Sequence, residues 1–398
     1  MTIIFLAHNC NIPFIHTELQ FLLQSDKVKR VKVFTDFPIE DLEVAFHDKC
    51  HVAVFGKGPK HALKINRTGI ILNELLSHTA WYVRRRKWKE LFLYSRDHMK
   101  KARFILDNGI AEDAILYSFW AGSGAFIISC LKRFGIKNMA LTRLHAFDIY
   151  EDGDNHGHIP WRSFVLKQLN HLITISEHGR RYLIGKYPYT RDKTRTITLG
   201  IPLVEESLNK APQNGLNIVS CSWVGTRKNL TRVFDALQHM PNTTWTHLGD
   251  GEDFEALKKH TSRPATLQFN LPGKFTSQGI QSYYREQNIT CFISLSTNEG
   301  LPVSMMEAMA FGIPVVSTDV GGCAEIVTPE TGVLLPKNYT NEDVVNAVKT
   351  CAEKFSTPEA RKRIQDFIKA NFDAETNYQK FLGFLKEENT KHMRAYNP

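Results

Sequence analysis

The chain has 398 residues, with 50 lysines and arginines against 41 aspartates and glutamates and a formal net charge of +9. This length is too great for a single hydrophobic core of ordinary size, so two domains are expected. A hydrophobic content of 42% and a charged content of 23% are those of a folded soluble protein. No window approaches eighteen uninterrupted apolar residues, which argues against a membrane-spanning helix.

The 7 cysteines are scattered and include no C-x-x-C pair. Reduced, buried thiols of a cytosolic protein explain them better than disulfides or a zinc site. The opening residues MTIIFLAHNCNIPF have no basic flank, so we expect a first β-strand there rather than a signal peptide. The basic charge balance favours anionic partners, namely nucleic acid, phosphorylated substrates or anionic lipid, with simple solubility as the alternative.

Short apolar runs open the chain and recur along its first half, each followed by a helical pattern. The runs are TIIFLA, VKVFTD, VAVFG, AILYSFW, MALTRLH, LITIS and TITLGIP. Such spacing predicts βαβ units and a mostly parallel sheet.

Residues 81–101 contain aromatic side chains among clustered cations, in the run WYVRRRKWK. Aromatic rings beside cations suit a lipid headgroup interface, which predicts a contact with an anionic membrane. The alternative is a solvated helix with a few core aromatics.

The stretch YEDGDNHGH contains Asp152-x-Asp154, with His156 and His158 close by. Clusters of this kind can hold divalent metals. The stretch is polar and lies in the first half of the chain, so we favour chance composition or contact with an acceptor.

A polar segment at 202–215 reads as an interdomain linker, and a second series of apolar runs follows it. These runs are LNIVSCS, TWTHLGDG, ATLQFNLPG, CFISLS, IPVVST and GVLLP. We therefore predict two doubly wound, Rossmann-like α/β domains, at 1–201 and 216–373, facing each other across a cleft. A charged helix over 374–398 is expected to cross back onto the first domain. Ligands of such sheets bind outside the carboxyl ends of the strands.

Two glutamates, Glu299 and Glu307, stand in the otherwise apolar stretch STNEGLPVSMMEAMAFGIPVVST of the second series. Pro302 and Gly312 predict the start and end of a helix that contains Glu307, with Glu299 in the loop before it. Eight residues of helix would rise about 12 Å, on the order of the span from a hexose through a diphosphate to a ribose. Carboxylates at each end would accept hydrogen bonds from sugar hydroxyls while the helix N-terminus attracts the diphosphate.

The run EGLPVSMMEAMAFGIPVVSTDVGG resembles the E-x7-E signature of the retaining GT-B glycosyltransferases of family 4. The likeness extends along the chain through LTRLHAFDIYED, LITISEHGRRYLIGKYP, CSWVGTRKNLTRVFDAL, LGDGEDFEALK and LPGKFTSQGIQSYYRE. Within the family, the chain is most similar to enzymes of bacterial capsule, exopolysaccharide or lipopolysaccharide assembly.

This resemblance implies roles for individual residues. Glu299 would contact the donor sugar, and Glu307 would hold the ribose hydroxyls. Lys228, with the loop at Gly300–Leu301, would neutralise the donor diphosphate, and His145 would lie near the reacting sugar carbon. Four residues would frame the nucleotide: Gly249, Gly251, Gly273 and Phe275.

The chain departs from the family pattern at two places. Trp223 stands where a diphosphate-binding arginine is usual, and Arg227 is the candidate to replace its charge. The glycine pair common after the first strand is absent, so Asn9, Asn11 or backbone groups would have to contact phosphate there.

The resemblance implies a retaining, metal-independent transfer from a UDP- or GDP-linked sugar, with no cofactor and no nucleic-acid partner. The acceptor would be a glycan or polyprenyl-linked oligosaccharide, and the enzyme would be cytoplasmic, at the inner face of the cytoplasmic membrane. Two alternatives stay open: a GT-B-fold sugar-nucleotide epimerase, and a non-catalytic protein that binds anionic lipid or nucleic acid.

Overall fold

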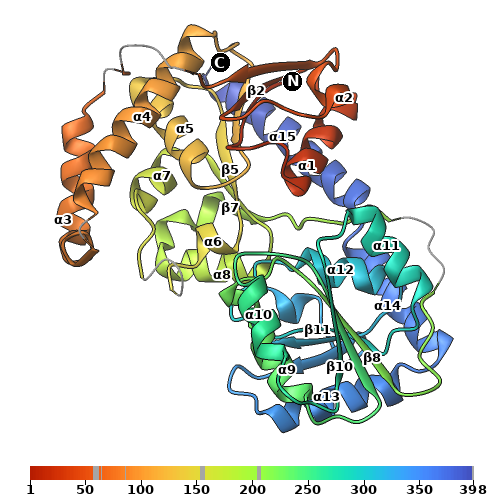
Figure 1. The fold of residues 1–398 in the computed structure, drawn as a ribbon. Helices are drawn as coiled ribbons and strands as arrows, with labels where there is room; N and C mark the ends of the chain where they lie inside the picture. The colour runs from red at the N-terminus through yellow and green to blue at the C-terminus, as the bar shows by residue number, and fades with distance from the viewer. Residues whose placement is uncertain (57–61, 64, 86, 153–156, 204–207, 397–398) are drawn as a thin grey trace. The chain divides into compact units, whose positions relative to one another are not determined.

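The computed structural model describes residues 1–56, 62–63, 65–85, 87–152, 157–203 and 208–396. The chain forms two compact units (Figure 1). The first comprises residues 1–175, 179–197 and 378–398, and the second comprises 176–178 and 198–377. Residues 204–207 of the expected linker lie outside the described residues. Among the described helices, none is both long and apolar enough to cross a membrane.

The first unit is built on a seven-stranded sheet, in the order β3-β2-β1-β4-β5-β6-β7, and every pairing is parallel. The central strands are buried on both faces, which is why they are continuous apolar runs in the sequence. The strands are β1 (Thr2–Leu6), β2 (Arg30–Thr35), β3 (Cys50–Val54), β4 (Ile115–Ser118), β5 (Ala140–Leu144), β6 (His171–Thr174) and β7 (Thr194–Thr196).

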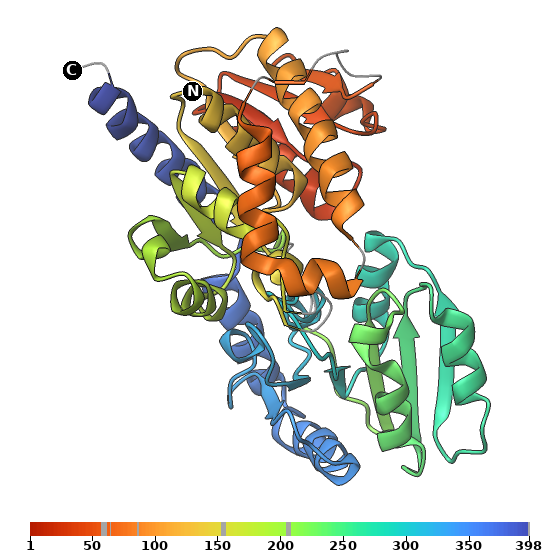
Figure 2. The same cartoon turned by 90° about the vertical axis from the view of Figure 1, so that its left-hand side faces the viewer.

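Helices connect these strands, and α3 and α4 pack against each other as a long pair (Figure 2). The helices before the second unit are α1 (Pro13–Gln24), α2 (Leu42–Ala45), α3 (Arg67–Arg85), α4 (Trp88–Asp107), α5 (Ser123–Phe134), α6 (Ala146–Ile149), α7 (Arg162–Gln168), α8 (Glu177–Lys186) and the 3-10 helix η2 (Pro188–Lys193).

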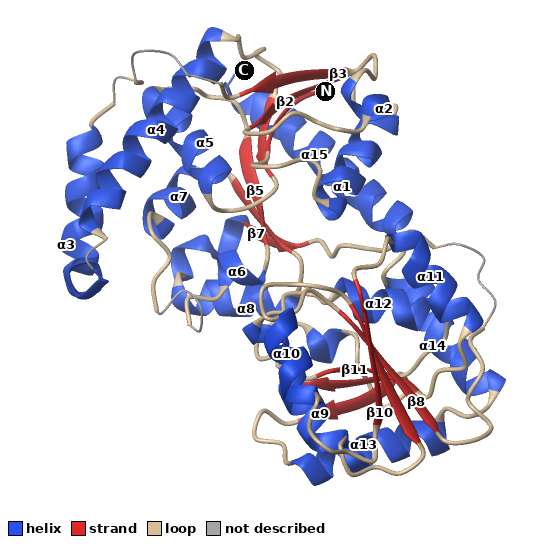
Figure 3. Ribbon diagram, in the orientation of Figure 1, coloured by secondary structure: helices blue, strands red, loops and turns tan. Residues whose placement is uncertain are grey.

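The second unit carries a six-stranded parallel sheet in the order β10-β9-β8-β11-β12-β13, drawn in red with helices on both faces in Figure 3. The strands are β8 (Leu216–Cys221), β9 (Thr243–Leu248), β10 (Gln268–Gly273), β11 (Cys291–Ser294), β12 (Val315–Thr318) and β13 (Gly332–Leu335). The predicted fold of two Rossmann-like parallel-sheet domains is thus confirmed.

The helices of the second unit follow its strands in the alternation that parallel sheets require. They are η3 (Thr226–Lys228), α9 (Leu230–Leu237), α10 (Phe254–Thr261), α11 (Ser277–Glu286), α12 (Val303–Ala310), η4 (Cys323–Glu325), α13 (Asn341–Lys354), α14 (Pro358–Asn371) and the start of α15 (Ala374–Tyr396).

Most of α15 belongs to the first unit, where a buried polar cluster holds it. The Arg143 Nε lies 3.4 Å from a carboxylate oxygen of Glu18, and both side chains are at most 1% exposed. The Tyr378 hydroxyl of α15 donates to the same carboxylate at 3.2 Å, and the Arg143 guanidinium stacks 4.3 Å from the ring centre of Phe381. The cluster therefore anchors the last helix in the N-terminal core.

Candidate functional site

The two glutamates lie where β11 ends and α12 begins. Glu299 is in the loop after β11 and is 9% exposed, while Glu307 lies inside α12. Pro302 directly precedes the helix, and Gly312, with φ of +75°, follows its end, as the sequence predicts. The helix begins only at Val303, however, so four of the eight steps between the glutamates are loop. The expectation that about 12 Å of continuous helix separates the two glutamates was therefore wrong.

Lys228 reaches Glu299 from a neighbouring loop. The Lys228 Nζ lies 2.6 Å from the Glu299 Oε1, with the side chains 27% and 12% exposed. Lys228 ends η3 in the loop after β8, and β8 pairs with β11. The two loops also join through their backbones, because the amide of Thr297 donates to the carbonyl of Arg227 at 2.9 Å. Two adjacent carboxyl ends of the sheet thus place a cation beside a carboxylate.

A third loop, which follows β12, packs against the loop that carries Glu299. The backbone of Gly321 has φ of +55°, and a Cβ there would lie 1.6 Å from the carbonyl oxygen of Glu299. Only glycine fits this approach. The next amide, that of Gly322, donates to the carbonyl of Gly300 at 2.9 Å. Leu301 of the same loop is buried, at 4% exposure. The loop that carries Glu299 is thus fixed by the glycine contacts and by the burial of Leu301.

Glu307 is a largely buried carboxyl. Burial raises its pKa to about 7 from the ordinary value of 4.5. Within the described part of the chain its carboxylate has no hydrogen-bond or ion-pair partner. Its charge acts on the Cys221 thiol at the end of β8 and on the Tyr284 phenol of α11, and raises the pKa of both, after the larger effect of burial. A buried carboxyl without partners is typical of a ligand site rather than of a packed core.

The residues expected to frame a nucleotide lie at the ends of β9 and β10. Gly249 adopts φ of +152°, and a Cβ there would lie 1.9 Å from the carbonyl oxygen of Ser222. Its amide donates to the carbonyl of Gly273 at 2.9 Å, which joins the two strand ends. A Cβ on Gly251 would likewise meet the Val224 carbonyl oxygen at 2.2 Å.

Phe275 lies two residues beyond Gly273, where its ring packs edge-on against Tyr283 of α11 at 6.4 Å between centres. The aromatic pair therefore follows directly on the joined strand ends.

His145 belongs to the first unit, immediately after β5. Burial, and then the neighbouring charge of Arg143, lowers its pKa to about 3, so the ring is neutral at ordinary pH. Both ring nitrogens are buried, and neither has a hydrogen-bond partner among the described residues. The ring stacks on Phe119 at 4.8 Å between centres, and its backbone amide donates to the Asp148 carboxylate at 2.5 Å. The geometry suits a neutral hydrogen-bonding group better than a general base.

The two departures from the family pattern have structural consequences. Trp223 is 63% exposed, and its indole N–H donates to the Glu252 carboxylate at 3.3 Å. Arg227 is exposed in the loop that precedes Lys228. In the first unit, the Asn11 side chain is engaged by Pro38 and Glu40, which leaves less of it for a phosphate.

The stretch around Asp152-x-Asp154 makes a contact that was not expected from the sequence. Asp154 and His156 lie outside the described residues. His158 is buried and pairs with Glu74 of α3. The sequence gives no sign of this pairing, because the two residues are 84 positions apart.

Sequence reasoning also missed three buried residues around the glutamates: Cys221, His247 and Tyr284. Burial is the main cause that lowers the pKa of His247 to about 4, a backbone hydrogen bond to Ser222 opposes it, and the charge of Lys228 adds to it. Cys221 and His247 lie at or next to the carboxyl ends of β8 and β9, and this position is the signal that could have found them. A groove of about 660 Å³ in the same unit lies instead beside the first residues of β8 and β9, and none of the candidate residues lines it.

Comparison with known proteins agrees with this geometry. Residues 208–370 match the family described as Glycosyl transferases group 1. The chain is 22% identical over 253 residues to the GtfA subunit of a UDP-N-acetylglucosamine–peptide N-acetylglucosaminyltransferase of Streptococcus gordonii, covering 59% of this chain and 48% of that one. It is 26% identical over 170 residues to the O-antigen biosynthesis glycosyltransferase WbnH of Escherichia coli, covering 43% and 47%. The chain thus spans about half the length of these curated relatives.

A solved structure extends the likeness to both units. Anabaena Alr3699/HepE, in complex with UDP-glucose, superimposes with a TM-score of 0.69 at 17% identity, over 97% of this chain and 100% of that one. At this identity the match shows the fold, which is the two-domain GT-B fold. Residues 208–370 are therefore similar to the glycosyl transferases group 1 family, on a chain with the GT-B fold.

Proposed function

We propose that this chain is a retaining glycosyltransferase of bacterial surface polysaccharide assembly. It moves a hexose or related sugar from a UDP- or GDP-linked donor to a glycan or lipid-linked glycan acceptor. The observation that carries the proposal is the pair of Lys228 and Glu299 at 2.6 Å. Glu299 lies on the loop that leads to Glu307, which has no partner among the described residues. The relatives support it, since one is named for O-antigen biosynthesis and a structural neighbour holds UDP-glucose.

Positive charge for the leaving diphosphate comes from Lys228. An ammonium group has three N–H donors, and Glu299 takes one of them, which leaves two for phosphate oxygens. The amides at the start of α12 add partial positive charge on the same side. Preorganised donors of this kind stabilise the charge that develops as the anomeric bond to phosphate breaks. We therefore propose that transfer needs no metal ion.

The two glutamates act as binding groups rather than as an acid and a nucleophile. Glu299 keeps acceptor capacity beyond its bond to Lys228, and this capacity suits the sugar hydroxyls. Glu307 receives the ribose hydroxyls. The acceptor oxygen bonds the anomeric carbon on the face that the phosphate leaves, and a donor phosphate oxygen takes the acceptor's proton. His145 orients the sugar as a neutral ring.

Thermal unfolding of the full chain against UDP-, GDP-, ADP-, dTDP- and CMP-linked sugars tests the donor site. A ligand at one hundred times its Kd stabilises by about 2.7 kcal/mol, which is several degrees in Tm. We expect one nucleotide class to raise Tm, and we expect EDTA to leave that increment unchanged. The increment should disappear in Glu307→Ala and persist in Glu353→Gln, a control at an exposed glutamate of α13.

Product analysis then separates the proposed function from its alternatives. A transferase consumes the donor only when a suitable acceptor is added, whereas an epimerase converts the donor sugar without one. A chain that responds to none of the nucleotide sugars at millimolar concentration has no donor site. That result would favour a non-catalytic binding protein.

A further inference from the structure

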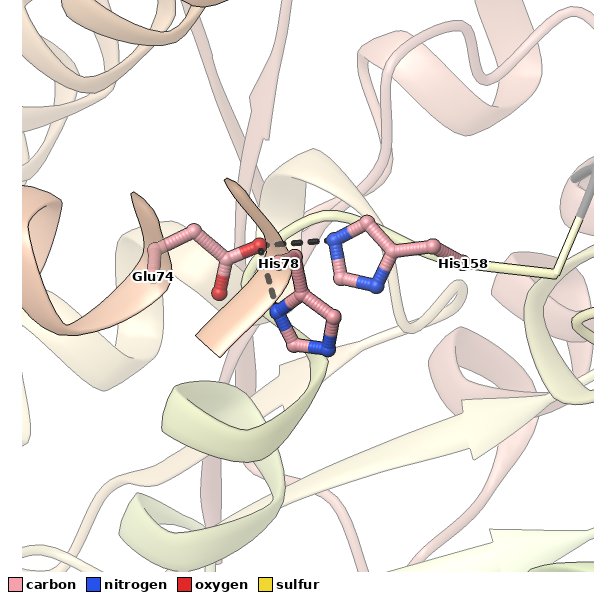
Figure 4. Close-up of side chains that lie close together, drawn as sticks. All are labelled: Glu74, His78 and His158. Carbon is pink, nitrogen blue, oxygen red and sulfur yellow. Dashed lines mark hydrogen bonds and ion pairs between the residues drawn. The ribbon is translucent and has the colours of Figure 1, made fainter. Parts of the chain in front are cut away.

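Three side chains that could ligate a metal converge in the first unit (Figure 4). Glu74 and His78 stand four residues apart on α3, and His158 comes from the segment before α7. One potential ligand atom from each lies within 4.8 Å of the others. The Glu74 Oε1 is 2.8 Å from the His158 Nε2 and 3.9 Å from the His78 Nδ1.

The cluster is largely buried, and its two histidines lie next to the Glu74 carboxylate. Glu74 is 4% exposed and His158 3%, while the His78 side chain is 33% exposed and leaves a path from solvent. The helix departs from helical geometry at His78, with φ of −137° and ψ of 30°, which turns this residue out of the regular helical path. The His78 and His158 rings stack at 3.7 Å between centres.

Groups outside the three side chains hold the carboxylate in place. The Tyr82 hydroxyl donates to the Glu74 Oε1 at 2.9 Å, and a backbone hydrogen bond from Trp161 also reaches the carboxylate. The ring of Trp81 packs edge-on against His158 at 5.1 Å between centres. Supporting hydrogen bonds and an apolar wall are what metal ligands need to stay oriented.

The hydrogen bonding of the two histidines is incomplete. The Nδ1 atoms of His78 and His158 are buried and have no hydrogen-bond partner among the described residues. Among the described residues, the Nδ1 of His78 therefore has no hydrogen bond to lose when it ligates a cation.

We propose that Glu74, His78 and His158 bind one divalent transition-metal ion, with zinc as the best match, and that the ion ties α3 to the segment before α7. Imidazole and carboxylate are ordinary ligands of zinc, at about 2.0–2.2 Å. Tetrahedral ligands at this bond length lie about 3.4 Å apart, between the two separations seen here. A water molecule completes the coordination from the side of His78.

The experiment uses the full chain without a polyhistidine tag, freed of metal by a chelator and titrated with Co²⁺ or Zn²⁺. We expect one ion per chain, an intense visible Co²⁺ spectrum of the four-coordinate type, and a rise in Tm with Zn²⁺. His78→Ala and Glu74→Gln should each abolish the spectrum and the rise in Tm. His51→Ala, at an exposed histidine of β3, should preserve both.

Two results would overturn the proposal: no bound ion at stoichiometric Co²⁺ in the unmodified chain, or an unchanged spectrum in the two variants. His78 is the partly exposed member, so its alanine variant should fold, and circular dichroism checks this. Glu74→Gln keeps the side-chain shape and decides the question by itself if the alanine variant does not fold. Neither outcome bears on the donor site, because the nucleotide-sugar increment in Tm is measured separately.

Discussion

Burial of the Glu307 carboxyl lowers the stability of the folded chain at neutral and higher pH. Its folded pKa of about 7 lies above the ordinary value of 4.5, so the folded chain holds a proton that the unfolded chain releases. The stability that this proton supplies is complete below pH 4.5 and is lost as the pH rises to about 7. Above pH 7 the penalty is constant and amounts to at most about 3 kcal/mol.

We therefore predict that Glu307→Gln is more stable than the unmodified chain at pH 8, by several degrees in Tm, and that the difference shrinks towards pH 5. Thermal unfolding over this pH range measures it. The same variant should lose the donor-induced increment, so one substitution should raise stability and remove binding. A Tm difference that does not change with pH would show that this carboxyl does not titrate between pH 5 and 8.

At the scale of elements, the attachment of α15 depends on the buried pair of Arg143 and Glu18. Removing one member leaves a charge buried without a partner, which costs about 3–5 kcal/mol. Arg143→Ala should therefore lower the free energy of unfolding by this amount and loosen α15, which donates to Glu18 through Tyr378. Chemical denaturation measures the first effect, and hydrogen exchange of residues 378–396 measures the second.

The matched control for this prediction is Arg133→Ala, at an exposed arginine of α5, which should change little. A double variant, Arg143→Met with Glu18→Leu, should recover part of the loss, because neither charge is then left unpaired. If the single and double variants were equally unstable, the loss would come from packing rather than from the buried charge.

The elements were predictable from the sequence because each is a local pattern. Buried parallel strands are short apolar runs, and Pro302 and Gly312 mark the limits of α12. The family resemblance gave Glu299 and Lys228 separate roles at the donor, and only the structure shows their contact at 2.6 Å. The raised pKa of Glu307 could not be predicted from the sequence, because it depends on how the whole second unit packs around this carboxyl.

The Glu74–His78–His158 cluster shows a second limit of sequence reasoning. The i, i+4 spacing of Glu74 and His78 is visible in the chain, but their partner is 80 residues beyond His78 and looked like part of an Asp-rich loop. Only the packing of α3 against the segment before α7 brings the three together. Long-range convergence of this kind leaves no periodic signal.

On the scale of the whole molecule, the net charge of +9 is concentrated in part where α3 ends and α4 begins. Arg84, Arg85 and Lys87 are exposed there, and Arg86 lies outside the described residues. Large apolar side chains are exposed along the same two helices: Leu72, Leu76, Val83, Phe92 and Leu93. Cations beside exposed apolar groups match an anionic membrane surface, which is where a lipid-linked acceptor would be found.

We predict that the chain co-sediments with vesicles containing anionic lipid and that replacing basic residues 84–87 by glutamine weakens this binding. Each cation near such a surface contributes about 1 kcal/mol, so the loss should be on the order of 100- to 1,000-fold in partition coefficient at low salt. Binding of the unmodified chain should also fall as salt rises. The control replaces four exposed cations of the second unit, Lys258, Lys259, Lys362 and Arg363, which keeps the net charge equal in the two variants. Equal losses in both would mean that overall charge, and not the α3–α4 surface, attracts the chain to the membrane.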